Sequence, residues 1–142
     1  YKSNKGRVIA CTPTAAPSLN ADAEAKRFVP DRDALTVYVV RRNWGDGRNF
    51  VKVYPDGGAG VDTLPDTMVR FKFKPGSHSV AFEFDGKRQS TTVEGRAGET
   101  RFLRFDGMVW AWKSTYEWVV ESETATRERA LKARLVADVA VL

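Results

Sequence analysis

The sequence predicts a mainly β fold, an antiparallel β-sandwich of about seven strands with one short C-terminal helix. Three observations support this prediction. Short runs rich in β-branched and aromatic residues recur along the chain, turn residues separate them at intervals of about ten residues, and 142 residues suffice for one hydrophobic core. Because most of these runs are apolar on one face, a second sheet must cover that face. We expect the sandwich domain to occupy residues 34–142, after an N-terminal tether over residues 1–33.

Eight segments have the composition of strands, of which seven or eight should form the sandwich. The first is apolar on both faces, which predicts a central strand. In the fourth, Val69, Phe71 and Phe73 share one face and basic residues share the other, so one side is buried and the other faces solvent. The eight segments are residues 35–41, 50–54, 60–64, 68–74, 78–84, 88–94, 100–105 and 110–120.

Turn residues connect these segments. Residues 55–58 read Pro-Asp-Gly-Gly and predict a hairpin, because proline presets the first turn residue and glycine accepts the positive φ that follows. Asp85-Gly86 is the strongest hairpin signal in the chain. The segment after it, residues 88–94, is polar and rich in threonine, as is typical of a strand at a sheet edge. Asp106-Gly107 predicts another turn.

The aromatic residues of the last predicted strand fall on even positions from Trp110 to Trp118 and would line one face, in the simplest interpretation the core face. A helix is predicted from about residue 125 to residue 139, capped by Ser122 or Thr124. Its apolar face is marked by residues four apart in the sequence, which are Leu131, Leu135 and Val139. Nearer the N-terminus, residues 20–33 are charged and rich in alanine, and we expect a short helical turn or an approach arm.

The only cysteine, Cys11, follows Val8-Ile9-Ala10, and this order resembles the cleavage and lipidation site of a bacterial lipoprotein signal. Residues 12–18 are small and interrupted by proline, as in a tether. An apolar signal stretch does not precede the cysteine, since residues 1–7 are polar. We therefore keep two interpretations of Cys11, a lipidated anchor or an isolated free thiol in an extended arm. One cysteine also excludes an internal disulfide and a cysteine-based zinc cluster.

The stretch from Val53 to Gly60 carries a turn rich in Asp and Gly, Leu64 follows, and in residues 69–78 an aromatic strand leads into a Pro-Gly-x-His turn. This succession resembles uncharacterised bacterial envelope lipoprotein domains and the related PEGA-like surface modules. The resemblance covers residues 35–118 and implies a small Ig-like β-sandwich, tethered to an envelope membrane and without catalysis. The sequence departs from the pattern at Pro55, where a backbone hydrogen-bond donor is usual, and in its tryptophan-rich last strand.

The net charge of +5 does not predict nucleic-acid binding. The first ten residues contain three basic residues and no acidic residue. From Cys11 onward the chain therefore has 20 basic and 18 acidic residues and is nearly neutral. The remaining basic residues are interleaved with acids or spaced as on a solvated helix face. No apolar run reaches the roughly 18 residues that cross a bilayer. We expect contact with a membrane through a lipid anchor only.

The residues that enzymes need for acid–base or nucleophilic catalysis are sparse. His78 is the only histidine, and its place after a Pro-Gly turn favours a structural role. Six aspartates could act in pairs, but all except Asp62 lie beside glycine or proline, where turn chemistry explains them. They are Asp46, Asp56, Asp62, Asp66, Asp85 and Asp106. We predict no enzyme, no cofactor and no metal site; carboxylates converging in a pocket would instead favour an enzyme.

A binding role is predicted for the glycine-hinged loop that follows the first strand. It combines a tryptophan with arginines, the residue types enriched at binding hot spots. Its predicted partner-binding residues are Arg42, Asn43, Trp44, Asp46 and Arg48. The alternative is that Trp44 folds back as a lid on the end of the sandwich.

Two hypotheses follow for the function. The first is a non-catalytic lipoprotein domain on the periplasmic side of the outer membrane, a protein-binding or structural module whose partner is another envelope protein or a secreted effector. The second is a periplasmic immunity or inhibitor protein that inserts residues 43–49 into the active site of a secreted toxin or hydrolase.

Overall fold

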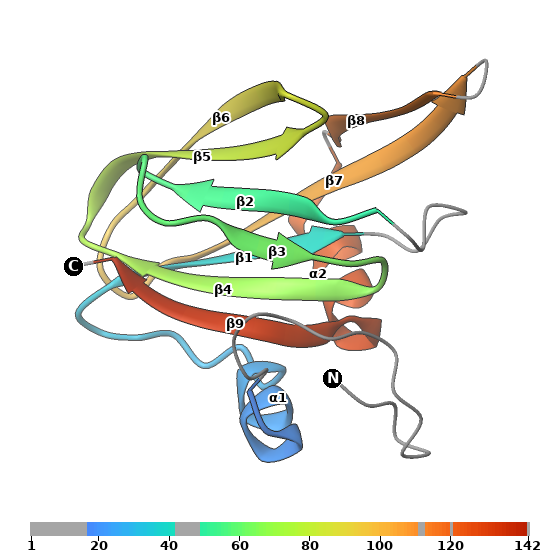
Figure 1. Ribbon diagram of the computed structural model, residues 1–142. Coiled ribbons are helices and arrows are strands. Elements are labelled where there is room, and N and C mark those ends of the chain that lie inside the picture. Colours follow the sequence, from blue (N-terminus) through green and yellow to red (C-terminus); the bar gives the residue numbers. More distant parts are fainter. Residues whose placement is uncertain (1–16, 42–48, 111–112, 120, 142) are drawn as a thin grey trace.

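The computed structural model describes residues 17–41, 49–110, 113–119 and 121–141. Within these ranges nine strands form two sheets that face each other, with a short helix before the last strand (Figure 1). The fold class predicted from the sequence, a mainly β sandwich with a short C-terminal helix, is confirmed. The strands are β1 (Leu35–Arg41), β2 (Val51–Pro55), β3 (Val61–Thr63), β4 (Thr67–Phe73), β5 (Gly76–Phe84), β6 (Lys87–Gly95), β7 (Thr100–Trp110), β8 (Lys113–Val119) and β9 (Arg134–Val141). The helices are α1 (Leu19–Ala25) and α2 (Glu123–Lys132).

One sheet has the strand order β8-β7-β1-β4-β9 and the other β3-β2-β5-β6. The second sheet is antiparallel throughout, as predicted. The first is mixed, because β7 runs parallel to β1 and β9 runs parallel to β4. Both parallel pairs arise because the chain leaves the first sheet before it returns. Between β4 and β7 it builds the β5–β6 hairpin in the opposite layer, and α2 carries it from β8 to β9, which lie at opposite ends of the sheet and run in the same direction.

The main core lies between the two sheets. Its largest fully buried members come from β4, β5 and β7, and include Phe71, Phe82 and Phe105. The rings of Phe82 and Phe105 stack across the interface with centroids 5.0 Å apart. Burial of each such side chain contributes about 1.5–3 kcal/mol relative to exposure. The alternation predicted for these strands therefore places their apolar faces where a second layer covers them.

A second apolar cluster covers the outer face of the five-stranded sheet, and this explains why β1 is buried along its whole length. Tyr38 and Val40 of β1 pack there against Ala25 and Phe28, at the end of α1 and just after it, and against Ala130 of α2. The Phe28 and Tyr38 rings meet edge to face at 5.0 Å. Part of the segment predicted as tether is thus packed on the sheet. The boundary at residue 33 stays a prediction.

The C-terminal helix is shorter than predicted. The side chain of Ser122 caps α2 by accepting a hydrogen bond from the Ala125 N–H (3.2 Å), and the helix ends at Lys132. Leu135 is fully buried in β9, whereas Leu131 is 51% exposed. The predicted apolar face does not persist in β9, because a register shift after Leu135 leaves Leu135 in the outer cluster with Met68 and places Val139 against the core between the sheets.

The turn predicted at Asp106-Gly107 is wrong. β7 continues through these residues and pairs with β8, with Asp106 opposite Glu117 and Gly107 opposite Tyr116. In contrast, the hairpin at Asp85-Gly86 is confirmed. Asp85 and Gly86 have φ values of 52° and 71°, the left-handed conformations that a two-residue hairpin needs at both turn positions.

Candidate functional site

The residues predicted from the sequence to carry function lie outside the described residues. Cys11 falls in residues 1–16, and the predicted partner-binding residues Arg42, Asn43, Trp44, Asp46 and Arg48 fall in residues 42–48. The residues on either side of the second segment, Arg41 and Asn49, are described. The contacts that these two residues make therefore locate the base of the predicted binding loop.

Both flanking residues bind the same tyrosine. Arg41 ends β1 and is only 1% exposed; its Nη2 donates to the Tyr116 hydroxyl (3.3 Å), and its Nη1 donates to the carbonyl of Thr63 (2.6 Å). Asn49 Nδ2 donates to the Tyr116 hydroxyl as well (3.1 Å) and to Ser114 Oγ (3.1 Å). A tyrosine oxygen has two lone pairs and can accept both hydrogen bonds. Tyr116 of β8 thus joins the two residues that flank residues 42–48.

The Tyr116 hydrogen bonds are reinforced by the position of its ring. The Arg41 guanidinium carbon lies 5.3 Å from the ring centroid, within the range of a cation–π contact. Tyr116 itself is only 4% exposed, and Phe84 meets it edge to face at 4.8 Å. The even spacing from Trp110 to Trp118 predicts an aromatic face that includes Tyr116, but nothing in it indicates that the Tyr116 hydroxyl accepts hydrogen bonds from Arg41 and Asn49.

The same tyrosine lines a cavity of about 130 Å³ between the end of the β5–β6 hairpin and β8. Aromatic rings of the two layers make its inner walls, and polar side chains of the hairpin and of β8 surround them. The lining residues are Phe82, Phe84, Asp85, Lys87, Gln89, Ser114, Thr115 and Tyr116. An apolar wall with a polar rim is typical of a site that binds a small apolar group.

A reciprocal pair of hydrogen bonds closes the seam between the two sheets beside this cavity. Gln89 of β6 donates through Nε2 to the carbonyl of Tyr116 (2.8 Å), and Trp118 Nε1 donates to the carbonyl of Gln89 (3.2 Å). The Trp118 ring packs on Phe82 at 5.2 Å. Because these contacts join edge strands of opposite layers, they hold the seam at a fixed width.

His78 is engaged as a structural residue. Its Nδ1 contacts the Asp56 carboxylate, its Nε2 contacts the carbonyl of Lys74, and its ring stacks on Phe73 at 4.4 Å. A carbonyl only accepts, so Nε2 is the donor in the contact with Lys74, and both ring nitrogens are engaged. Burial opposes ionisation of Asp56, but hydrogen bonds from His78 and from the Ser79 N–H (2.8 Å) hold the pKa of Asp56 below its usual range.

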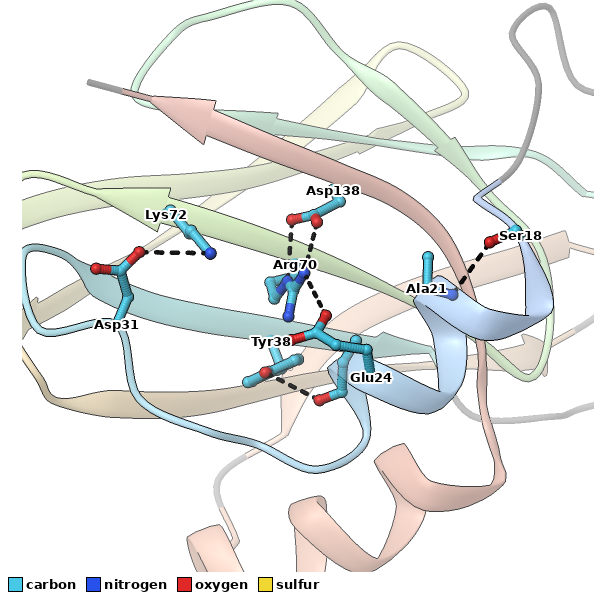
Figure 2. Close-up of polar contacts among 9 residues, drawn as sticks. Ser18, Ala21, Glu24, Asp31, Tyr38, Arg70, Lys72 and Asp138 are labelled. Carbon is cyan, nitrogen blue, oxygen red and sulfur yellow. Dashed lines mark hydrogen bonds and ion pairs between the residues drawn. The ribbon is translucent and has the colours of Figure 1, made fainter.

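Charged side chains on the outer face of the five-stranded sheet fasten α1 (Figure 2). Arg70 donates to both oxygens of Asp138 (3.0 and 2.6 Å) and to Glu24 of α1 (3.1 Å). The Asp138 hydrogen bonds hold the pKa of Arg70 above its ordinary value. Beside them the Tyr38 hydroxyl donates to the carbonyl of Ala25 (3.1 Å), and burial raises the pKa of Tyr38. These groups hold the helix in place and lie on the side of the sheet away from the cavity.

Comparisons with known proteins do not assign the chain to a family. No model of a known protein family matches its sequence, and no curated protein matches it. Among the described residues, no helix has the length and apolar character to span a membrane. The resemblance to envelope lipoprotein domains over residues 35–118 therefore stays a prediction from the sequence.

Proposed function

We propose that this chain is a non-catalytic, protein-binding domain of the bacterial cell envelope. It is held at the periplasmic side of the outer membrane by a lipid on Cys11, and it binds another envelope protein or a secreted effector. Its binding surface comprises residues 42–48 and the cavity that Tyr116 lines. The observation that carries this proposal is the convergence of Arg41 and Asn49, on either side of that segment, on Tyr116, which also lines the cavity.

The anchoring of the loop ends favours binding for an energetic reason. Ordering a loop on association costs free energy, and loop ends that are already fixed reduce that cost. Trp44, Arg42 and Arg48 are of the residue types that dominate binding energy at protein interfaces. A cavity of about 130 Å³ is also close to the size of about 150 Å³ that accommodates a benzene ring. It suits one aromatic or branched aliphatic side chain of a partner.

The way in which the ionisable residues are used supports a non-catalytic role. His78 has both ring nitrogens engaged, and Asp56 is bound to that ring and to the backbone N–H of Ser79. Asp85, the one carboxylate that lines the cavity, occupies a hairpin turn with positive φ. Two converging carboxylates, the arrangement that would favour a hydrolase, are not found among the residues lining the cavity.

Affinity capture from envelope extracts tests the binding surface. The wild-type chain should retain a specific partner, and Trp44→Ala should lose most of it. Ser114→Leu places a larger apolar side chain in the cavity and should weaken capture about tenfold or more. Ser77→Leu, the same change at an exposed position at the far end of β5, is the matched control and should bind like the wild type. Equal capture by all four proteins would rule out this surface.

The anchor is tested separately. In the full-length, signal-bearing protein, Cys11→Ser should move the domain from the membrane fraction to the soluble fraction, because the thiol is the site of lipid attachment. Membrane fractionation followed by immunoblotting gives the distribution. Continued membrane association of Cys11→Ser would contradict lipidation without affecting the proposed binding surface.

The immunity or inhibitor hypothesis uses the same surface. A loop with both ends fixed, as Arg41 and Asn49 are fixed by Tyr116, suits insertion into an enzyme's active site. In that case the captured partner is a toxin or hydrolase, it forms an equimolar complex, and its activity falls on binding. A partner that keeps full activity in the complex favours the structural module instead.

A further inference from the structure

The two sheets end in four edge strands, of which one is short and two have a backbone group bound by a side chain from another element. β3 has only three residues. On β8 the carbonyl of Tyr116 is bound by the Gln89 side chain, and on β9 the N–H of Leu135 donates to Asp22 of α1 (2.7 Å). β6 also accepts one hydrogen bond from the other sheet, from Trp118 Nε1 to the carbonyl of Gln89 (3.2 Å), but Gln89 pairs with Phe82 of β5 and this bond leaves the opposite edge of β6 uncovered. β6 is nine residues long, its pairing with β5 is continuous from Gly95 to Lys87, and within the described residues β5 is the strand it pairs with (Figure 1).

The free edge of β6 lacks the features that usually prevent edge strands from pairing. Such edges are protected by proline, by bulges or by charged residues along the strand. β6 has no proline and no bulge, and its central residues 89–93 (Gln-Ser-Thr-Thr-Val) are uncharged. The charges stand at the two ends, with Arg88 near the hairpin turn and Glu94 at the other end.

The hairpin turn fixes which backbone groups face the free edge. In a two-residue hairpin the residues that flank the turn, here Phe84 and Lys87, exchange both backbone hydrogen bonds, and hydrogen-bonded pairs then alternate along the ladder. The odd-numbered residues of β6 therefore bond to β5. The N–H and C=O groups of the even-numbered residues point away from β5; these residues are Arg88, Ser90, Thr92 and Glu94.

The outward edge of β6 is complementary in charge and hydrogen bonding to the same edge of a second copy. If two copies of β6 run antiparallel around a twofold axis at Thr91, Arg88 lies opposite Glu94 of the second copy, and Ser90 lies opposite Thr92 of the second copy. All four are even-numbered, so the outward backbone groups of one strand meet those of the other. Each pair is favourable, because opposite charges and hydroxyl residues stabilise cross-strand positions. Arg88 is exposed on this face, where its guanidinium lies over the Tyr54 ring at 4.4 Å.

We propose that the chain forms a dimer by antiparallel pairing of β6 with β6 of a second copy, in the register centred on Thr91. The two four-stranded sheets then become one continuous sheet. An isologous contact of this kind closes at two subunits, since each copy uses its free β6 edge once. The inference is independent of the proposed partner-binding surface at residues 42–48.

Charge exchange in the full chain tests the register. Sedimentation equilibrium should show a dimer for the wild type. Arg88→Glu or Glu94→Arg alone should lower the association constant about tenfold or more, because in each variant both of the Arg88–Glu94 pairs across the twofold axis become pairs of like charge. The double variant Arg88→Glu/Glu94→Arg should restore the wild-type constant. A wild-type chain that stays monomeric up to concentrations on the order of 1 mM, or a double variant no better than the singles, would overturn the proposal.

A backbone variant tests the strand pairing itself. Thr92→Pro removes an N–H that faces the free edge and not β5, so the folded monomer should remain and the dimer should be lost. Thr92→Val keeps the N–H and the β-branched shape, and is the matched control that should still dimerise. Circular dichroism checks the fold of both. A folded Thr92→Pro chain that dimerises like Thr92→Val would refute the pairing, and where Thr92→Pro does not fold, the charge exchange decides.

Discussion

Replacing Tyr116 by phenylalanine removes one oxygen atom and tests whether this side chain fixes the ends of residues 42–48. The oxygen accepts hydrogen bonds from Arg41 Nη2 and Asn49 Nδ2. Arg41 is only 1% exposed, so solvent does not readily replace the lost acceptor, and its hydrogen bond to the carbonyl of Thr63 remains. A buried donor that loses its acceptor costs about 1–3 kcal/mol, so the free energy of unfolding should fall by about that amount.

Urea unfolding followed by tryptophan fluorescence measures this loss. Tyr54→Phe is the matched control, because the Tyr54 ring is half-buried on the solvent face of β2 and should change stability by less than about 0.5 kcal/mol. Partner capture by Tyr116→Phe should fall as well, since the loop ends are released. If Tyr116→Phe and Tyr54→Phe unfold at the same urea concentration and bind equally well, the anchoring role of Tyr116 is wrong.

Two further predictions concern the fold. Leu135→Ala should lower the free energy of unfolding by about 2–5 kcal/mol, because Leu135 is fully buried in β9. Leu131→Ala, at an exposed position of α2, should change it by less than about 0.5 kcal/mol. Similar losses in the two variants would contradict the end of α2 at Lys132. Asp56 has a lowered pKa in the folded chain, so its hydrogen bonds stabilise the fold above the pKa of the unfolded chain, about 4, and this contribution is lost as the pH falls through the lower folded pKa. Asp56→Asn should flatten the acid limb of a plot of stability against pH, and an unchanged acid limb would show that the contact with His78 contributes no stability.

Most of the strands could be predicted from local patterns, because alternation and turn chemistry act over a few residues. The predicted first strand agrees with β1 residue for residue, and the Asp85-Gly86 hairpin has the expected positive φ angles. The polar segment after that hairpin was expected at a sheet edge, and β6 lies there. In each case the local signal and the tertiary structure require the same conformation.

Local patterns failed where pairing with a distant strand sets the structure. Leu135 and Val139 have helical spacing, but in β9 a register shift puts them on opposite faces of the sheet, and the strand pairs with β4, far away in the sequence. Asp106-Gly107 has turn composition, but Asp106 is bound to the Arg104 guanidinium and its strand pairs onward with β8. In both places long-range pairing overrides local preference.

The candidate site was even less accessible from the sequence. The hydrogen bonds from Arg41 and Asn49 to Tyr116 join residues 75 and 67 positions apart. The cavity exists only because the β5–β6 hairpin of one sheet ends over β8 of the other. Sequence composition could indicate a binding loop rich in Trp and Arg, but not which side chain holds its ends.

The central claim, that residues 42–48 and the cavity beside Tyr116 form one binding surface, is tested most directly by isothermal titration of the captured partner. The partner should bind the Ser114→Leu chain about tenfold or more weakly than the Ser77→Leu chain. Equal dissociation constants for these two variants would contradict the claim.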